Sequence, residues 1–161
     1  MIEILSFRKE HQRDVLELIL EIQREEFGFS IRAEDQPDLS DIENFYQSGA
    51  GGFWVAVAEN RVVGTIALRD IGNDQGALRK MFVKASHRGK QFAVAHHLLD
   101  HLVLFAQRKG VHELYLGTTE RFLAAHRFYE KQGFVQVSPE LLPPAFPRMA
   151  VDTRFYHRAI T

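Results

Sequence analysis

The sequence contains no cysteine. Disulfide bonds and thiolate metal sites are therefore excluded, and so is acyl transfer through a cysteine nucleophile.

Long apolar runs and an excess of charge of one sign are also missing. No apolar stretch is long enough to span a bilayer, and the N-terminus lacks the charged-then-apolar pattern of a signal peptide. The 20 basic and 21 acidic residues give a net charge of -1, which provides no general attraction to nucleic acid or to anionic membranes. We therefore expect a cytoplasmic protein with neither nucleic acid nor a membrane as a partner.

The composition that remains is that of an ordinary globular protein. The 161 residues fit one domain, residues 1–161, and a hydrophobic content of 45% allows a sizeable core. No internal repeat or linker divides the chain.

The spacing of apolar residues predicts the order of helices and strands. Helices are expected at about residues 11–27, 38 or 40 to 47, 88–109 and 120–132. Strands are expected at residues 3–7, 53–58, 62–69, 77–83, 112–117, 134–137 and 149–156. Hairpins give antiparallel pairs, whereas a strand-helix-strand unit gives a parallel one. The predicted fold class is α/β (α+β), with a mixed, mostly antiparallel sheet, a central parallel β-α-β crossover and helices on both faces.

A basic turn that contains a glycine follows the strand expected at residues 77–83. Five basic residues and no acid lie between positions 79 and 90: Arg79, Lys80, Lys84, Arg88 and Lys90. Where a strand turns into a helix, the first helical N–H groups are unpaired, and the positive end of the helix dipole favours an anion such as phosphate. We therefore place the functional site at residues 81–93.

Two motifs here resemble those of the GNAT superfamily of acyl-CoA-dependent N-acetyltransferases, in its stand-alone bacterial form. Arg88-Gly89-Lys90-Gln91-Phe92-Ala93 is similar to the family's Arg/Gln-x-x-Gly-x-Gly/Ala pyrophosphate loop, with Gln91 at the first glycine position. Ala125-His126-Arg127-Phe128-Tyr129 resembles the segment in which an alanine packs near CoA and a tyrosine faces the leaving sulfur. Phe122 stands where that segment often has asparagine.

The resemblance implies an enzyme that moves an acetyl group from acetyl-CoA directly to a primary amine of a small molecule or peptide, without a metal. Tyr129 is implied as the general acid for the departing thiolate, whose pKa is about 8.5. A backbone N–H at the end of the Met81–Val83 strand is implied as the donor to the developing oxyanion. The residues implied to bind CoA are Met81, Phe82, Val83, Arg88, Gly89, Lys90, Gln91, Phe92, Ala93, Thr118 (or Thr119) and Ala125.

The residues that would receive the acceptor carry no motif. Glu25 and Glu26 are candidate bases because they end a helix that GNAT folds place beside the acceptor. Glu113 is a third candidate, and a water chain is the alternative to all of them. Phe29, Tyr46 and Phe146 are candidates for the acceptor pocket.

Other interpretations of the chain stay open. A CoA-sensing domain without catalysis could share the fold, and a nucleic-acid-binding module could use the basic cluster. His96, His97 and His101 have a usable metal-ligand spacing, but the neighbouring Asp100 and Arg108 indicate a face turned to solvent. A homodimer is also open.

Overall fold

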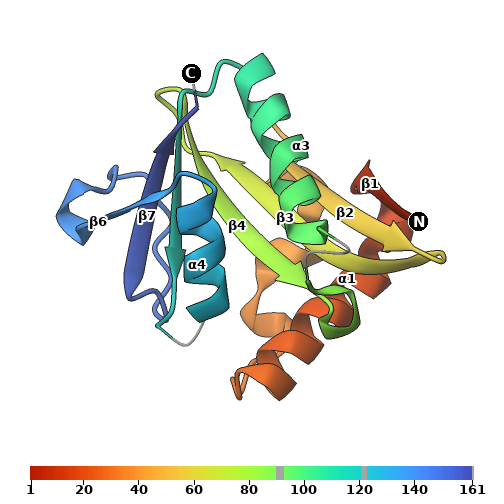
Figure 1. Ribbon diagram of the computed structural model, residues 1–161. Helices are drawn as coiled ribbons and strands as arrows, with labels where there is room; N and C mark the ends of the chain where they lie inside the picture. The colour runs from red at the N-terminus through yellow and green to blue at the C-terminus, as the bar shows by residue number, and fades with distance from the viewer. Residues whose placement is uncertain (90–92, 121–122, 161) are drawn as a thin grey trace.

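A seven-stranded sheet runs through the molecule in the order β1-β2-β3-β4-β5-β7-β6 (Figure 1). The computed structural model describes residues 1–89, 93–120 and 123–160. The strands are β1 (Ile2–Ser6), β2 (Gly52–Ala58), β3 (Arg61–Asp70), β4 (Gln75–Val83), β5 (Glu113–Thr118), β6 (Val135–Val137) and β7 (Arg154–Ala159). Only β4 and β5 pair in parallel; the other neighbouring strands are antiparallel. The predicted mixed sheet is confirmed.

Helices cover both faces of this sheet, as predicted. The α-helices in the described ranges are α1 (Gln12–Glu21), α2 (Ile42–Phe45), α3 (Val94–Arg108) and α4 (Leu123–Lys131), and α1 continues as a π-helical turn, η2 (Ile22–Glu26). Short 3-10 turns are η1 (Lys9–His11), η3 (Ala33–Asp35), η4 (Pro37–Ser40), η5 (Ala85–His87) and η6 (Pro139–Leu141). Helices α3 and α4 lie in front of the sheet and α1 behind it (Figure 1). No helix in the described ranges has the length and apolar character needed to cross a membrane.

Each face of the sheet has its own apolar core. Helix α3 buries a stripe at spacings of three and four on one face: Val94, Leu98, Leu99, Leu102, Val103 and Ala106. Helix α1 packs on the opposite face through Val15, Leu18 and Ile19. Neighbouring residues of β3 serve both cores, since Ile66 belongs to the first and Ala67 to the second. Burial on two sides explains why β2 and β3 are continuous apolar runs in the sequence.

The two largest errors in the predicted boundaries lie beside the functional site. The helix expected from residue 88 begins at Val94, because Gly89 (φ +111°) and Ala93 (φ +50°) adopt left-handed backbone conformations before it. The strand expected from residue 149 begins at Arg154. The preceding residues form a turn in which the Met149 N–H donates to Asp152 Oδ2 at 3.0 Å.

The parallel strands β4 and β5 separate after a short paired stretch. They pair only where Gln75–Ala77 lies opposite Glu113–Tyr115. On the other side of β4, Arg79 pairs with Ala67 and Phe82 with Thr65, so that Lys80 and Met81 together lie opposite Ile66. This is a β-bulge, in which Lys80 has φ +54° and its carbonyl accepts a 2.7 Å bond from Thr65 Oγ1. The sheet is therefore irregular and split where the predicted donor-binding strand ends.

Candidate active site

A cavity of about 550 Å³ lies at the split between β4 and β5. It brings together residues that the sequence predicted from five separate segments: Phe29, Met81, Phe82, Thr118, Ala125, Tyr129 and Phe146. The walls also include residues 78–80 of β4, residues 116–119 at the end of β5, and residues 149–152 of the turn before β7. The residues predicted to bind the acetyl donor, to act as general acid and to bind the acceptor therefore line the same cavity.

Tyr129 faces this cavity from α4 and is otherwise enclosed. Its side chain is 5% exposed, and its ring packs edge-on against Phe134 with centroids 5.7 Å apart. Burial raises the pKa of the Tyr129 hydroxyl above its ordinary value, because the phenolate would lose its hydration. The hydroxyl therefore stays protonated at neutral pH and can donate a proton or a hydrogen bond.

Thr118 presents an unsatisfied hydroxyl at the end of β5. The residue is 6% exposed, and its Oγ1 has no hydrogen-bond partner within the described part of the chain. An unpaired buried polar group costs about 1–3 kcal/mol. A ligand that supplies an amide or carbonyl group at this wall of the cavity would recover that free energy, as the pantetheine arm of CoA can.

The N-terminus of α3 forms an open backbone site. Ala93 precedes the first helical turn and offers no side-chain cap, so the first helical N–H groups have no acceptor from it. A β-carbon added at Gly89 would meet nothing within 4 Å. This geometry suits an anion at the helix N-terminus. The predicted contacts Lys90, Gln91 and Phe92 lie outside the described residues.

Arg88 is held by protein groups rather than standing free for phosphate. Its Nη1 and Nη2 donate to the two oxygens of Glu26 at 2.5 and 2.9 Å, and its Nε donates to the Val83 carbonyl at 2.8 Å. This ion pair bears on two predictions. Glu26, a candidate base, and Arg88, a candidate phosphate ligand, are each already engaged by the other. The pair joins η2 to the turn before α3.

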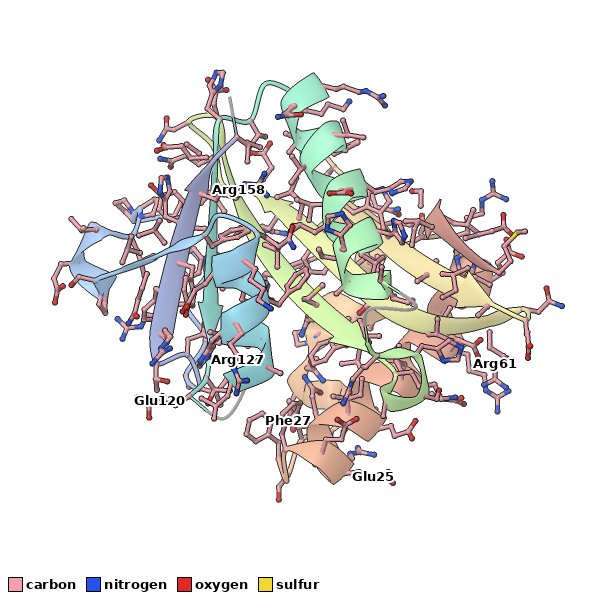
Figure 2. All side chains as sticks on the ribbon, in the orientation of Figure 1. Glu25, Phe27, Arg61, Glu120, Arg127 and Arg158 are labelled. Carbon is pink, nitrogen blue, oxygen red and sulfur yellow. The ribbon has the colours of Figure 1, made fainter. Side chains whose placement is uncertain are left out.

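The other candidate bases lie outside the cavity lining. Glu25 is exposed at the lower end of the helix formed by α1 and η2 (Figure 2). Glu113, at the start of β5, accepts bonds from Gln75 (3.1 Å) and His157 (3.1 Å). These contacts, led by the Gln75 bond, hold the pKa of Glu113 below its usual value, which makes it a weaker proton acceptor.

Tyr46 and the three histidines of α3 also lie away from the cavity. Tyr46 is 1% exposed in the core, and its hydroxyl donates to Asp38 Oδ2 at 2.5 Å, so it can affect an acceptor only through other residues. His96, His97 and His101 are exposed, as expected for a face turned to solvent. In the described ranges no group of three or more His, Asp or Glu side chains is placed to hold a metal ion.

A buried polar network, which the sequence did not reveal, joins β4 to the segment after α1. Lys80 Nζ donates to Gln36 Oε1 at 2.7 Å and lies 3.5 Å from Asp38 Oδ2. Gln36 in turn exchanges two hydrogen bonds with Gln23, of 3.1 and 2.9 Å. Burial lowers the pKa of Lys80, against the opposing effect of Asp38. The sequence places Lys80 in the basic cluster expected to bind phosphate, but its ammonium instead contacts the segment after α1.

Asp152 and Arg79 are two further charged groups in the cavity. The sequence places Arg79 in the basic cluster expected to bind phosphate, and it did not indicate Asp152. Asp152 is half-buried and lies against Gly117, where an added β-carbon would come within 2.5 Å of its Oδ2. Arg79 reaches the same turn, with Nη2 3.3 Å from the sulfur of Met149. For Asp152, the nearest signal in the sequence was Phe146, the acceptor-pocket candidate in the loop before it.

Comparison with known proteins is consistent with this geometry. The model of the Acetyltransferase (GNAT) family matches residues 16–134. An N-acetylaspartate synthetase from Xenopus tropicalis is 44% identical over 132 residues, which cover 75% of this chain and 47% of that protein. The chain therefore spans less than half the length of this relative.

Solved structures give the same fold over the whole chain. A GNAT-family acetyltransferase from Staphylococcus aureus superposes with a TM-score of 0.95 at 36% identity and covers 100% of both chains. The PaiA N-acetyltransferase from Thermoplasma acidophilum, solved in complex with coenzyme A, has the same fold with a TM-score of 0.75 at 18% identity, over 99% of each chain.

Proposed function

The chain belongs to the GNAT family of acetyltransferases, and on that basis we propose that it acetylates a free amino acid with a side-chain carboxylate, such as aspartate. Members of this family use acetyl-CoA as donor and an amine as acceptor. The acceptor class is suggested by the relative named N-acetylaspartate synthetase. No finding supports a CoA-sensing domain without catalysis.

The observation that carries the acceptor proposal is the charge of the cavity wall. Arg79 and Lys80 both line the cavity from β4. Lys80 is already paired with Asp38, whereas Arg79 forms no ion pair with any described residue. A guanidinium presents a planar fork that matches a carboxylate. Arg79 is therefore the group best suited to bind a carboxylate of the acceptor.

Aromatic rings hold Arg79 in place for this role. Its guanidinium carbon lies 5.8 Å from the ring centroid of Phe45 and 5.9 Å from that of Tyr46. A cation near an aromatic face is stabilised without a hydrogen bond being used. Apart from Nη2, which contacts the Met149 sulfur, the donors of the fork can thus remain directed to a ligand while the side chain is restrained.

The proposed reaction is a direct transfer. The neutral amine attacks the thioester carbonyl, and charge on its oxygen is stabilised by backbone N–H groups that the bulge at Lys80 releases from the regular ladder. Tyr129 supplies the proton that the departing thiolate needs. The absence of cysteine is consistent with a mechanism that has no acyl-enzyme.

A thiol-release assay tests the proposal. Protein and acetyl-CoA are mixed with aspartate, glutamate, asparagine, polyamines, aminoglycosides and lysine peptides, and free CoA thiol is followed with a disulfide reagent, against which a cysteine-free protein gives no background. We expect kcat/KM to be highest for an acidic amino acid. Faster turnover of a polyamine or peptide would contradict the acceptor class, and no turnover of any amine would contradict the activity.

One variant tests the role of Arg79. We expect Arg79→Gln to raise the KM for aspartate about tenfold or more, since a hydrogen bond to a charged group contributes about 1.5–3 kcal/mol, while the KM for acetyl-CoA stays the same. The matched control is Arg61→Gln in the β2–β3 hairpin, on the opposite side of the molecule from α4 (Figure 2). An unchanged KM for aspartate in Arg79→Gln would exclude this contact.

Two sequence-based expectations stay predictions. Cytoplasmic residence follows from the sequence patterns alone, and cell fractionation tests it. Homodimer formation is measurable by sedimentation of the purified protein.

A further inference from the structure

Asp152 is the only carboxylate among the described residues that line the cavity. The three acids that the sequence offered as bases, Glu25, Glu26 and Glu113, do not line it. A base must come within hydrogen-bond reach of the proton that it removes. Of these acids, Asp152 alone is placed to contact a substrate bound in the cavity, whatever their pKa values.

The fold holds the Asp152 carboxylate in one place. Its Oδ2 accepts the 3.0 Å bond from the Met149 N–H, and the next residue, Thr153, donates its N–H to the Thr118 carbonyl at 2.9 Å. Thr153 Oγ1 also accepts a 3.1 Å bond from the Glu120 N–H. Two hydrogen bonds thus fasten the turn to the end of β5. Because Oδ2 alone is engaged by a hydrogen bond from the described residues, Oδ1 is available to a ligand.

Gly117 makes this position of the carboxylate sterically possible. A β-carbon there would lie 2.5 Å from Asp152 Oδ2 and 2.8 Å from its Cγ. Any other residue at position 117 would push the carboxylate away from β5. A glycine in mid-strand costs stability, and here the lost side chain leaves room for an acid in the cavity.

The electrostatic setting suits a proton acceptor. Burial raises the pKa of the Asp152 carboxyl, and the Met149 N–H and the cations Arg79, Arg148 and Lys80 act in the opposite direction. Asp152 forms no ion pair with any described residue at its resting position. Tyr129, the titratable group on α4 in the same cavity, stays neutral. A carboxylate with a raised pKa holds a transferred proton better than a solvent-exposed one.

We propose that Asp152 is the base that deprotonates the acceptor, a role that rests on the N-acetyltransferase function proposed above. An N–H bond of the acceptor ammonium breaks, its electron pair stays on nitrogen, and the proton moves to Asp152 Oδ1. The nitrogen then forms the C–N bond to the thioester carbonyl carbon, and the C–S bond breaks as Tyr129 protonates the sulfur. The remaining excess proton on nitrogen returns to the Tyr129 oxygen, and Asp152 releases its proton to solvent.

Asp152→Asn tests this role, because asparagine keeps the shape and can accept the Met149 bond but cannot take a proton. We expect kcat with the best acceptor to fall about 10²–10³-fold near pH 7, within the range of acid–base catalysis, with the acetyl-CoA KM unchanged. The loss should shrink as pH rises, because solution then supplies more neutral amine. Asp152→Glu should restore part of the activity. Asp74→Asn, in the exposed turn before β4, is the matched control.

Three results would overturn the assignment. Wild-type kcat in Asp152→Asn would mean that no proton passes through this residue. A loss of equal size at every pH, or a weakened affinity for CoA, would make Asp152 structural instead. Failure of the wild-type enzyme to acetylate any amine would contradict the proposed function itself, which is a different outcome from an active enzyme that does not need Asp152.

Discussion

At the scale of single residues, burial has opposite chemical consequences for two titratable groups that line the cavity, Tyr129 and Asp152. It raises the pKa of Tyr129, which keeps a proton donor protonated, and it raises the pKa of Asp152, which makes a carboxylate a better acceptor. Two groups in one cavity thereby become suited to the two proton transfers of amide formation. Tyr129 lies in a family motif, whereas no motif marks Asp152 in the sequence.

Tyr129→Phe removes the proposed proton donor and little else. We expect kcat to fall about 10²–10⁴-fold with little change in the KM for acetyl-CoA, because the ring still packs against Phe134. Since the pKa of Tyr129 lies above its ordinary value of 10.0, the wild type should show no loss of kcat from this residue as pH rises to 10. Steady-state kinetics between pH 6 and 10 measure both effects.

Tyr115→Phe is the control for that experiment. It deletes the same atom from a buried tyrosine of β5 that does not line the cavity, and kcat should stay at the wild-type value. An unchanged kcat in Tyr129→Phe would remove the general-acid role. Equal losses in the two variants would point to a general effect on the core.

At the scale of elements, strands were predictable and the special backbone positions were not. Apolar runs located all seven strands, most clearly β2 and β3, which are buried on both faces. The left-handed conformations of Lys80 and Ala93 have no local signature, since neither is a glycine. They depend on how β4 pairs with β3 and on how the turn packs before α3. The predicted helix therefore began six residues too early, at 88 instead of 94.

The site was predictable only where it follows motifs. The strand at Met81 and the tyrosine at 129 were found because each lies in a family segment of contiguous residues. Asp152 and the Lys80 network were missed, because tertiary contacts bring Asp152 to Gly117, 35 residues away, and Lys80 to Gln36, 44 residues away. The sequence around an acid in a turn does not indicate which cavity wall the acid will contact in the fold.

The ion pair between η2 and the turn before α3 leads to a prediction at the same scale. Glu26 occupies both terminal nitrogens of Arg88, so a phosphate must compete with it for the same fork. We expect Arg88→Ala to weaken CoA binding about tenfold and Glu26→Gln to tighten it severalfold. The double variant should bind like Arg88→Ala, and calorimetric titration with CoA measures all three.

Glu25→Gln is the control for this pair, because Glu25 is the exposed neighbour of Glu26 and should not affect affinity. Weaker CoA binding in Glu26→Gln would mean that the ion pair supports the loop rather than competing with the ligand. Unaltered affinity in Arg88→Ala would exclude the guanidinium as a phosphate contact, leaving the backbone of the turn.

At the scale of the whole molecule, the split divides the sheet into two parts that share little hydrogen bonding. Strands β1 to β4 form one part, strands β5 to β7 the other, and only the short stretch from Gln75 to Ala77 pairs them. Near the cavity, the parts are linked instead by side chains, such as Arg79 of β4 against Met149. A donor bound in the split would contact both parts and take the place of the missing pairing.

Hydrogen exchange can test this bridging role of the donor. We expect CoA to slow exchange at the amides of residues 81–83 and 116–118 at least tenfold, because the pantetheine arm would bind along both separated strands. Adenosine 3′,5′-bisphosphate, which lacks that arm, should protect the N-terminus of α3 without protecting these strands. Both ligands are compared at equal saturation, since stabilisation by mass action depends on saturation alone. Equal protection of the split by the two ligands would show that phosphate binding rigidifies the sheet, and the arm would then have no bridging role.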